Sequence, residues 1–129
     1  MYKILIPKDV EFVKYEQEIK ELYYKNQDLI GDSSSFEYIR DNTFFYLLVV
    51  EDKPTGAIYY FLKDKKLWLN AFSIRKNHKY NLEFLTQSLE WFNCDIYAEA
   101  RNRMSALCLL KVGFKSVEKN SFVLKKRNL

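Results

Sequence analysis

Apolar residues fall every three to four positions in two stretches of the chain, and this is the period of an amphipathic helix. The first stretch covers residues 10–25, and Asp9 in front of it is the expected N-cap. The second stretch covers residues 82–93, with Asn81 as its expected cap. The pattern therefore predicts two helices, each with one apolar face turned toward a core.

Two further helices are predicted from their capping residues. Ser34 and Glu37 have the spacing of a capping box, so a short helix is expected over residues 35–41. Asn102 can cap a helix over residues 103–112 by accepting a hydrogen bond from a backbone N–H of the first turn.

Between the helices the pattern becomes extended. Residues 44–51 form a nearly continuous apolar run, which is typical of a strand buried on both faces. Short connections in the segment that follows predict an antiparallel meander of three strands. The helix over residues 82–93 has a strand on either side, which predicts a parallel or splayed pair. The other expected strands cover residues 2–6, 57–62, 67–74, 95–100, 114–118 and 122–126.

Composition is consistent with one folded domain over residues 1–129, since 48% of the residues are hydrophobic and 17% are aromatic. No apolar run approaches the roughly 20 residues that span a membrane, and the run at residues 2–6 is too short for a signal peptide. We therefore expect a cytoplasmic protein in which Cys94 and Cys108 are reduced thiols and no metal is bound.

The net charge of +4 is too small to indicate a nucleic-acid-binding protein. Its two basic patches, at residues 63–66 and 125–127, are interpreted as a solvated turn and a solvated tail. A weak positive field would still favour anionic ligands.

Residues 96–114 carry the most informative motif of the chain. A short strand leads to Asn102, a helix follows, and Gly113 and Phe114 close it. This run resembles the second half of the acyl-CoA site in the GNAT superfamily of N-acetyltransferases, and the order of strands and helices is similar to that family over nearly the whole chain. The resemblance implies an α+β fold, with a mixed, mostly antiparallel sheet of about seven strands flanked by about four helices.

The resemblance also implies where acetyl-CoA would bind. Asn102 matches a family asparagine that helps to hold the pantetheine arm. The thioester carbonyl would meet a backbone N–H at the end of the fourth expected strand, at Phe72, Ser73 or Ile74. The pyrophosphate would lie at the start of the next helix. There the family pattern Arg/Gln-x-x-Gly-x-Gly/Ala aligns with Asn77, His78, Lys79, Tyr80, Asn81 and Leu82.

This pyrophosphate loop departs from the family pattern at both glycine positions. Tyr80 and Leu82 stand where the glycines are expected, so their side chains would crowd the phosphates. Leu109 stands where the family often has a tyrosine that protonates the departing thiolate. The chain is therefore interpreted as a divergent relative with a degenerate phosphate loop.

Two carboxylates are candidates for the general base. Glu99 lies on the strand over residues 95–100, where alternation places it opposite Ala98 and Ala100. Glu51 lies at the end of an earlier strand, and for both residues a surface or ion-paired carboxylate stays an open interpretation. Two functions follow. The first is transfer of an acetyl group from acetyl-CoA to an amine. The second is a GNAT-fold binding or regulatory protein without transfer activity, with a protein partner or a second copy of the chain.

Overall fold

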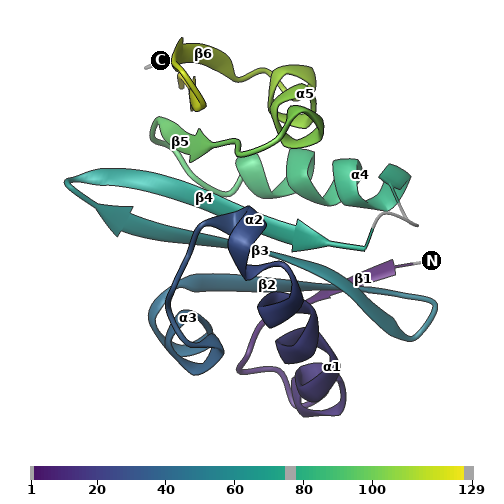
Figure 1. Ribbon diagram of the computed structural model, residues 1–129. Coiled ribbons are helices and arrows are strands. Elements are labelled where there is room, and N and C mark those ends of the chain that lie inside the picture. Colours follow the sequence, from purple (N-terminus) through teal and green to yellow (C-terminus); the bar gives the residue numbers. More distant parts are fainter. Residues whose placement is uncertain (1, 75–77, 127–129) are drawn as a thin grey trace.

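A seven-stranded sheet with helices on both faces organises the protein in the computed structural model, which describes residues 2–74 and 78–126 (Figure 1). The strand order is β1-β2-β3-β4-β5-β7-β6. Every neighbouring pair is antiparallel except β4 and β5, which are parallel. The strands are β1 (Tyr2–Leu5), β2 (Phe44–Val50), β3 (Lys53–Lys63), β4 (Lys66–Ser73), β5 (Ile96–Glu99), β6 (Lys115–Glu118) and β7 (Ser121–Leu124).

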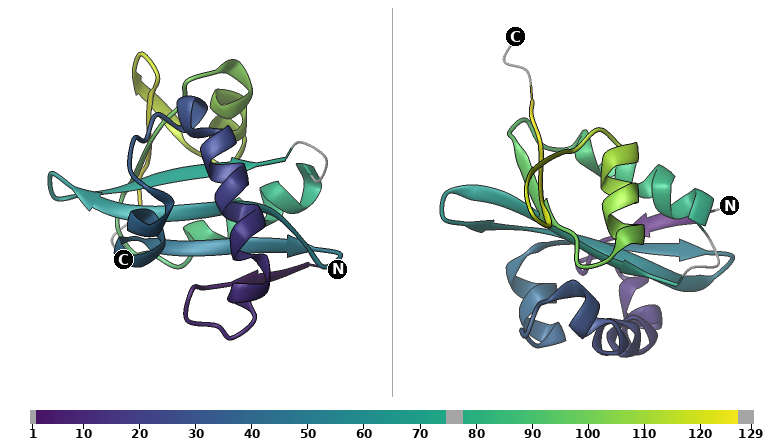
Figure 2. Two further views of the ribbon diagram at one scale, coloured as in Figure 1. Left: turned by 60° about the horizontal axis from the view of Figure 1, so that its bottom comes forward. Right: turned by 45° about the horizontal axis from the view of Figure 1, so that its top comes forward.

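Five helices are found in the described residues, one more than expected. They are α1 (Phe12–Lys25), α2 (Gln27–Ile30), α3 (Phe36–Asn42), α4 (His78–Leu89) and α5 (Arg103–Lys111). Helices α1 to α3 cover one face of the sheet, and α4 and α5 lie on the other (Figure 2). The predicted α+β fold with a mixed, mostly antiparallel sheet is therefore confirmed. The additional helix is the short α2. No described helix combines the length and the apolar character that a membrane crossing requires.

The starts of α1, α3 and α4 differ from the expected ones because caps were assigned from residue type alone. Asp9 does not cap α1, since its carboxylate accepts a hydrogen bond from the N–H of Ile6 at 2.8 Å. Ser35, and not Ser34, caps α3, and its hydroxyl accepts from the N–H of Tyr38 at 3.1 Å. Helix α4 begins at His78, so Asn81 lies inside the helix. This last shift changes the functional site.

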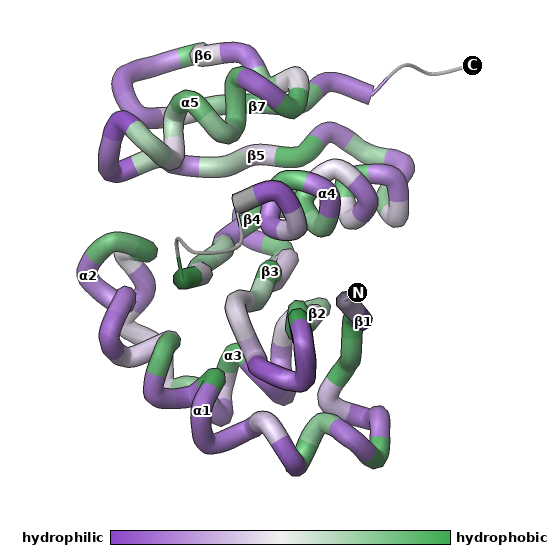
Figure 3. Tube along the Cα trace, turned by 90° about the vertical axis from the view of Figure 1, so that its right-hand side faces the viewer, coloured by the Kyte–Doolittle hydropathy of each residue, from purple (hydrophilic) through white to green (hydrophobic). Residues whose placement is uncertain are grey.

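Two hydrophobic clusters fill the two faces of the sheet, and β2 and β3 contribute to both. Leu47 and Val49 pack with α1 and α3, whereas Leu48 and Val50 pack with α4 and α5. The continuous apolar run that predicted β2 is thus explained by burial on both sides. Helix α1 is mainly hydrophilic along its length in Figure 3, because its apolar residues occupy a single face.

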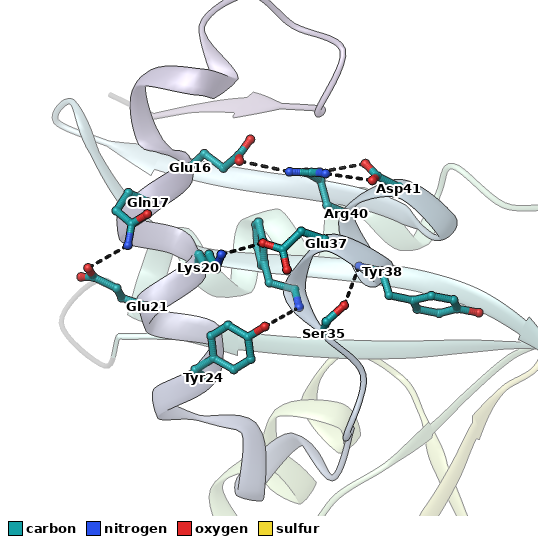
Figure 4. Close-up of polar contacts among 11 residues, drawn as sticks. Glu16, Gln17, Lys20, Glu21, Tyr24, Ser35, Glu37, Tyr38, Arg40 and Asp41 are labelled. Carbon is teal, nitrogen blue, oxygen red and sulfur yellow. Dashed lines mark hydrogen bonds and ion pairs between the residues drawn. The ribbon is translucent and has the colours of Figure 1, made fainter.

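Polar contacts connect α1 to α3 (Figure 4). Arg40 pairs with Glu16 at 3.1 Å, and Lys20 pairs with Glu37 at 2.6 Å. Half-exposed pairs of this kind contribute little to stability individually.

Candidate functional site

The parallel strands β4 and β5 pair over only three residues. The partners are Leu67 with Ile96, Trp68 with Tyr97, and Leu69 with Ala98. Strand β4 continues to Ser73, but beyond Leu69 it has no partner on β5. The two central strands therefore separate. We call the space beyond Leu69 and Ala98 the strand gap.

Backbone direction decides which donors of β4 face the strand gap. The N–H of Ile74 donates to the carbonyl of Thr55 on β3 at 2.9 Å. Because N–H groups alternate along an antiparallel strand, those of Ser73 and Ala71 point away from β3, toward the gap. Among the three predicted backbone donors, Ser73 alone is thus oriented toward the gap. The ring of Phe72 is buried on the opposite face, 5.5 Å from that of Tyr23.

A cavity of about 550 Å³ occupies the strand gap, and we call it the inter-strand cavity. Its walls come from β4 and β5, from α4 and α5 on one face, and from the end of α1 and α2 on the other. Six of the residues expected at the site line it, namely Phe72, Ser73, Asn81, Leu82, Glu99 and Asn102. Ile74, Lys79, Tyr80 and Glu51 lie outside that lining. Asn77 lies outside the described residues, and His78 is the first residue of α4.

Asn81 lines the inter-strand cavity, and its amide oxygen is a hydrogen-bond acceptor that no described residue uses. Its Nδ2 donates to Ser73 Oγ at 3.1 Å and to the carbonyl of Ile74 at 3.2 Å. A carbonyl can only accept, so the orientation of the Asn81 amide is fixed. Its Oδ1 is buried and has no hydrogen-bond partner among the described residues. An unpaired buried acceptor costs about 1–3 kcal/mol.

Tyr80 and Leu82, which stand where glycines were expected, lie in different surroundings near the start of α4. The ring of Tyr80 packs against that of Tyr2 on β1, with centroids 5.3 Å apart. Leu82 lines the inter-strand cavity. Of the two large side chains, only Leu82 therefore narrows the space beside the helix start. The first N–H groups of α4 have no partner within the helix, and they are suited to an anion.

Helix α5 begins as the sequence predicts. Asn102 has an extended backbone, and its Oδ1 accepts a hydrogen bond from the N–H of Ser105 at 2.8 Å. The cap uses the amide oxygen, so the Nδ2 of Asn102 remains available as a donor beside the cavity.

Replacing Asn102 with alanine is expected to lower the free energy of unfolding by about 1 kcal/mol, because the first turn of α5 loses its cap. Serine at the same position keeps an acceptor for the N–H of Ser105, and its variant should stay close to the wild type. Urea unfolding followed by circular dichroism measures both. Equal losses in the two variants would show that Asn102 does not stabilise α5 through its cap.

The two candidate bases occupy different places. Glu99 is exposed on β5, opposite Ser121 of β7, and it lines the inter-strand cavity. Glu51 follows β2 in a turn, with a φ of 50°, and does not line the cavity. The geometry therefore brings Glu99, and not Glu51, together with Asn81, Asn102 and Ser73.

Sequence reasoning missed Arg101 as a wall of the inter-strand cavity. Its guanidinium crosses from the loop after β5 to the end of α2, where a Cβ added at Gly31 would lie 2.1 Å from Nε. No local pattern in the sequence connects these two loops, because their contact depends on how the strands separate. Gly31 also has a φ of 74°, so glycine is favoured there for two reasons.

The sequence matches no protein-family model and no curated protein. Similar solved structures nevertheless cover nearly the whole chain. The ribosomal-protein-S5-alanine acetyltransferase of Vibrio fischeri superposes with a TM-score of 0.63 at 15% identity, over 95% of this chain and 90% of that one. An aminoglycoside 6'-acetyltransferase of type Ii gives 0.67 at 14% identity, over 97% and 96%.

A third similar structure was solved with coenzyme A bound. It is the putative N-acetyl transferase YhhK of E. coli, with a TM-score of 0.62 at 14% identity, over 97% of this chain and 98% of that one. Together with the separated parallel strands, these similarities define an acetyltransferase-like α+β fold. The protein has the GNAT fold, and the low identities make it a divergent example of that fold.

Proposed function

We propose that the protein is an acetyl-CoA-dependent N-acyltransferase that acts on an amine. The observation that carries the proposal is the inter-strand cavity between β4 and β5. It combines free backbone donors on one wall, the amide donor of Asn102 on another and the carboxylate of Glu99 on a third. The GNAT fold supports coenzyme A as the ligand of this cavity, since YhhK, of the same fold, was solved with coenzyme A.

The residues of the cavity fit a pantetheine arm. The Nδ2 of Asn102, which is exposed beside the cavity, would donate to a carbonyl of the arm. The pyrophosphate would meet the first N–H groups of α4, with Lys79 exposed nearby on the same turn. Acetyl-CoA supplies, when bound, an acetyl group activated as a thioester.

The chain's own residues would then act on the acceptor amine. The N–H groups of Ser73 and Ala71 point into the strand gap, where they would stabilise negative charge on a carbonyl oxygen. Glu99 would accept a proton from the amine, directly or through a water molecule. Leu109, which lines the cavity, has no proton to give to a departing thiolate.

A second function, ligand binding without transfer, is favoured by Leu82 and Leu109. Both line the inter-strand cavity where the family has a glycine and often a tyrosine. A binding protein of this kind would hold acyl-CoA but release no CoA in the presence of amines.

Calorimetric titration with acetyl-CoA, followed by an assay of CoA release with a panel of amines, tests the proposal. We expect saturable binding and amine-dependent CoA release. Glu99→Gln should keep the binding and slow the release by about 100-fold, which is within the usual contribution of a general base. Glu51→Gln is the matched control and should leave both unchanged. Absence of binding at millimolar acetyl-CoA would refute the proposal, and binding without release by the wild type would favour the second function.

A further inference from the structure

A second depression lies beside the inter-strand cavity, on the face of the sheet that α1 to α3 cover. It has a volume of about 750 Å³ and runs between β3, α3 and the loop of residues 31–34. We call it the α3 groove. Apolar side chains form part of its walls: Tyr38 on α3 is 56% exposed, and the ring of Phe61 lies 6.1 Å from that of Tyr59. Asn70 lines both the α3 groove and the inter-strand cavity, and no other described residue does so.

Asp32 gives the α3 groove a negative charge. Its carboxylate accepts hydrogen bonds from the N–H of Ser34 at 2.8 Å and from the hydroxyl of Tyr59 at 2.7 Å. It forms no ion pair with any residue of the ranges 2–74 and 78–126. Asp41 also lines the groove, but Arg40 neutralises it at 2.8 Å. Lys63 is the basic residue of the lining.

A chain of hydrogen bonds runs from Asp32 through Tyr59 to Asn70. It determines which atom of the Asn70 amide is left as an acceptor. Burial, together with the bond to Asp32, raises the pKa of Tyr59 well above its usual range, so its hydroxyl keeps its proton at neutral pH. A carboxylate only accepts, so Tyr59 must donate to Asp32. The oxygen of Tyr59 then accepts from Asn70 Nδ2 at 3.1 Å.

This direction fixes the orientation of the Asn70 amide. Its Nδ2 is held by Tyr59, so its Oδ1 is left as an acceptor and makes no hydrogen bond to the described part of the chain. Tyr23 holds the same loop in place, because its hydroxyl donates to the carbonyl of Ser34 at 2.7 Å. Asn70 Oδ1 is therefore a hydrogen-bond acceptor held in place where the α3 groove meets the inter-strand cavity.

We infer that the acceptor substrate is a cationic amine with an apolar chain, which occupies the α3 groove and donates an N–H to Asn70 Oδ1 at the entrance to the inter-strand cavity. Asn70 is the specificity-determining residue of this site, and Tyr59 and Asp32 are positioning residues that act through it. The inference rests on the proposed acyltransferase function, since it describes how the amine would reach that cavity.

Two conservative substitutions separate orientation from charge. Asp32→Asn removes the charge, and if the new amide oxygen stays with Ser34, its NH₂ group faces Tyr59. Tyr59 must then accept from it and donate to Asn70, so the Asn70 amide turns its NH₂ group toward the substrate. Tyr59→Phe breaks the chain and keeps the charge. Each change should weaken the binding of a cationic amine by about tenfold or more, because a hydrogen bond to a charged group is lost or reversed.

The probes are cadaverine and 1,5-pentanediol, which have the same carbon chain with and without charge. Titrations of the ¹⁵N-labelled protein are followed by NMR at pH 7. We expect cadaverine to bind more tightly than the diol and to shift the signals of residues 31–34 and the side-chain amide of Asn70. Asp32→Asn should also shift that amide signal in the free protein, which a merely structural role would not cause.

Acetyl-CoA binding and the thermal unfolding of each variant are the controls. Acetyl-CoA binding should stay near the wild-type value, because neither residue lines the inter-strand cavity. Thermal unfolding should remain one cooperative transition, lowered in Tyr59→Phe because that buried hydroxyl makes two hydrogen bonds. Equal affinity for cadaverine and the diol, or unchanged cadaverine affinity in both variants, overturns the inference. Failure of the wild type to bind acetyl-CoA would count against the proposed function instead, so the two failures are distinguishable.

Discussion

Replacing Phe45 with alanine is expected to lower the free energy of unfolding by about 3–5 kcal/mol. The side chain is 2% exposed and lies at the centre of the cluster under α1 and α3. Its ring contacts those of Phe12, Phe36 and Tyr59, with centroid distances of 6.0, 5.8 and 6.2 Å. No neighbouring chain segment can move in to fill the space, because the sheet and two helices enclose it.

Phe44 is the matched control for this prediction. It is the preceding residue on β2, points to the other face and is 51% exposed. Alanine at this position should cost less than about 1 kcal/mol, as most surface substitutions do. Guanidinium unfolding of both variants measures the difference. Similar losses would mean that β2 is not in the register described, because a shift of one residue exchanges the two faces.

Replacing Ser105 with tryptophan is expected to weaken acetyl-CoA binding by about 10- to 100-fold, which is the usual cost of forcing a large side chain into an occupied space. Ser105 lies in the first turn of α5 and lines the inter-strand cavity. An indole in that position would compete with the pantetheine arm.

Leu107→Trp provides the control on the same helix. Leu107 is 51% exposed and does not line the cavity, so its variant should bind acetyl-CoA like the wild type. Calorimetry of both proteins decides the matter. If Leu107→Trp weakened binding as much as Ser105→Trp, the ligand would lie elsewhere on α5.

The sequence was most informative where structure depends on local chemistry. Asn102 caps α5 as expected, because an N-cap needs only its own side chain and the next turn. The run of residues 44–51 predicted β2 correctly, since burial on both faces leaves a continuous apolar pattern. The parallel pair of β4 and β5 followed from the helix between them.

Helix starts were less predictable, and the site depends on one of them. The apolar period identifies the buried face of α4 but does not say where its first turn begins. Asn81 therefore looked like a cap, whereas the structure places it inside the helix with its Oδ1 buried and unpaired in the described part of the chain. The sequence also made Tyr80 and Leu82 look equivalent. The structure distinguishes them, because Tyr80 packs against Tyr2 of β1 whereas Leu82 lines the inter-strand cavity.

Contacts between distant segments could not be predicted at all. Asp32, Tyr59 and Asn70 form one hydrogen-bonded chain, yet they lie on a loop and two strands. Their meeting depends on the register of β3 against β4 and on the path of the loop after α2. The choice of Glu99 over Glu51 likewise required the separation of β4 from β5, which no local pattern specifies.

The central claim is that acetyl-CoA binds between β4 and β5, and the two cysteines test it most directly. Cys108 is half-buried and lines the inter-strand cavity, whereas Cys94 is exposed outside it. N-ethylmaleimide should alkylate both in the free protein, and mass spectrometry follows each site separately. The account predicts that saturating acetyl-CoA slows the alkylation of Cys108 and leaves that of Cys94 unchanged. Equal rates at Cys108 with and without millimolar acetyl-CoA would contradict it.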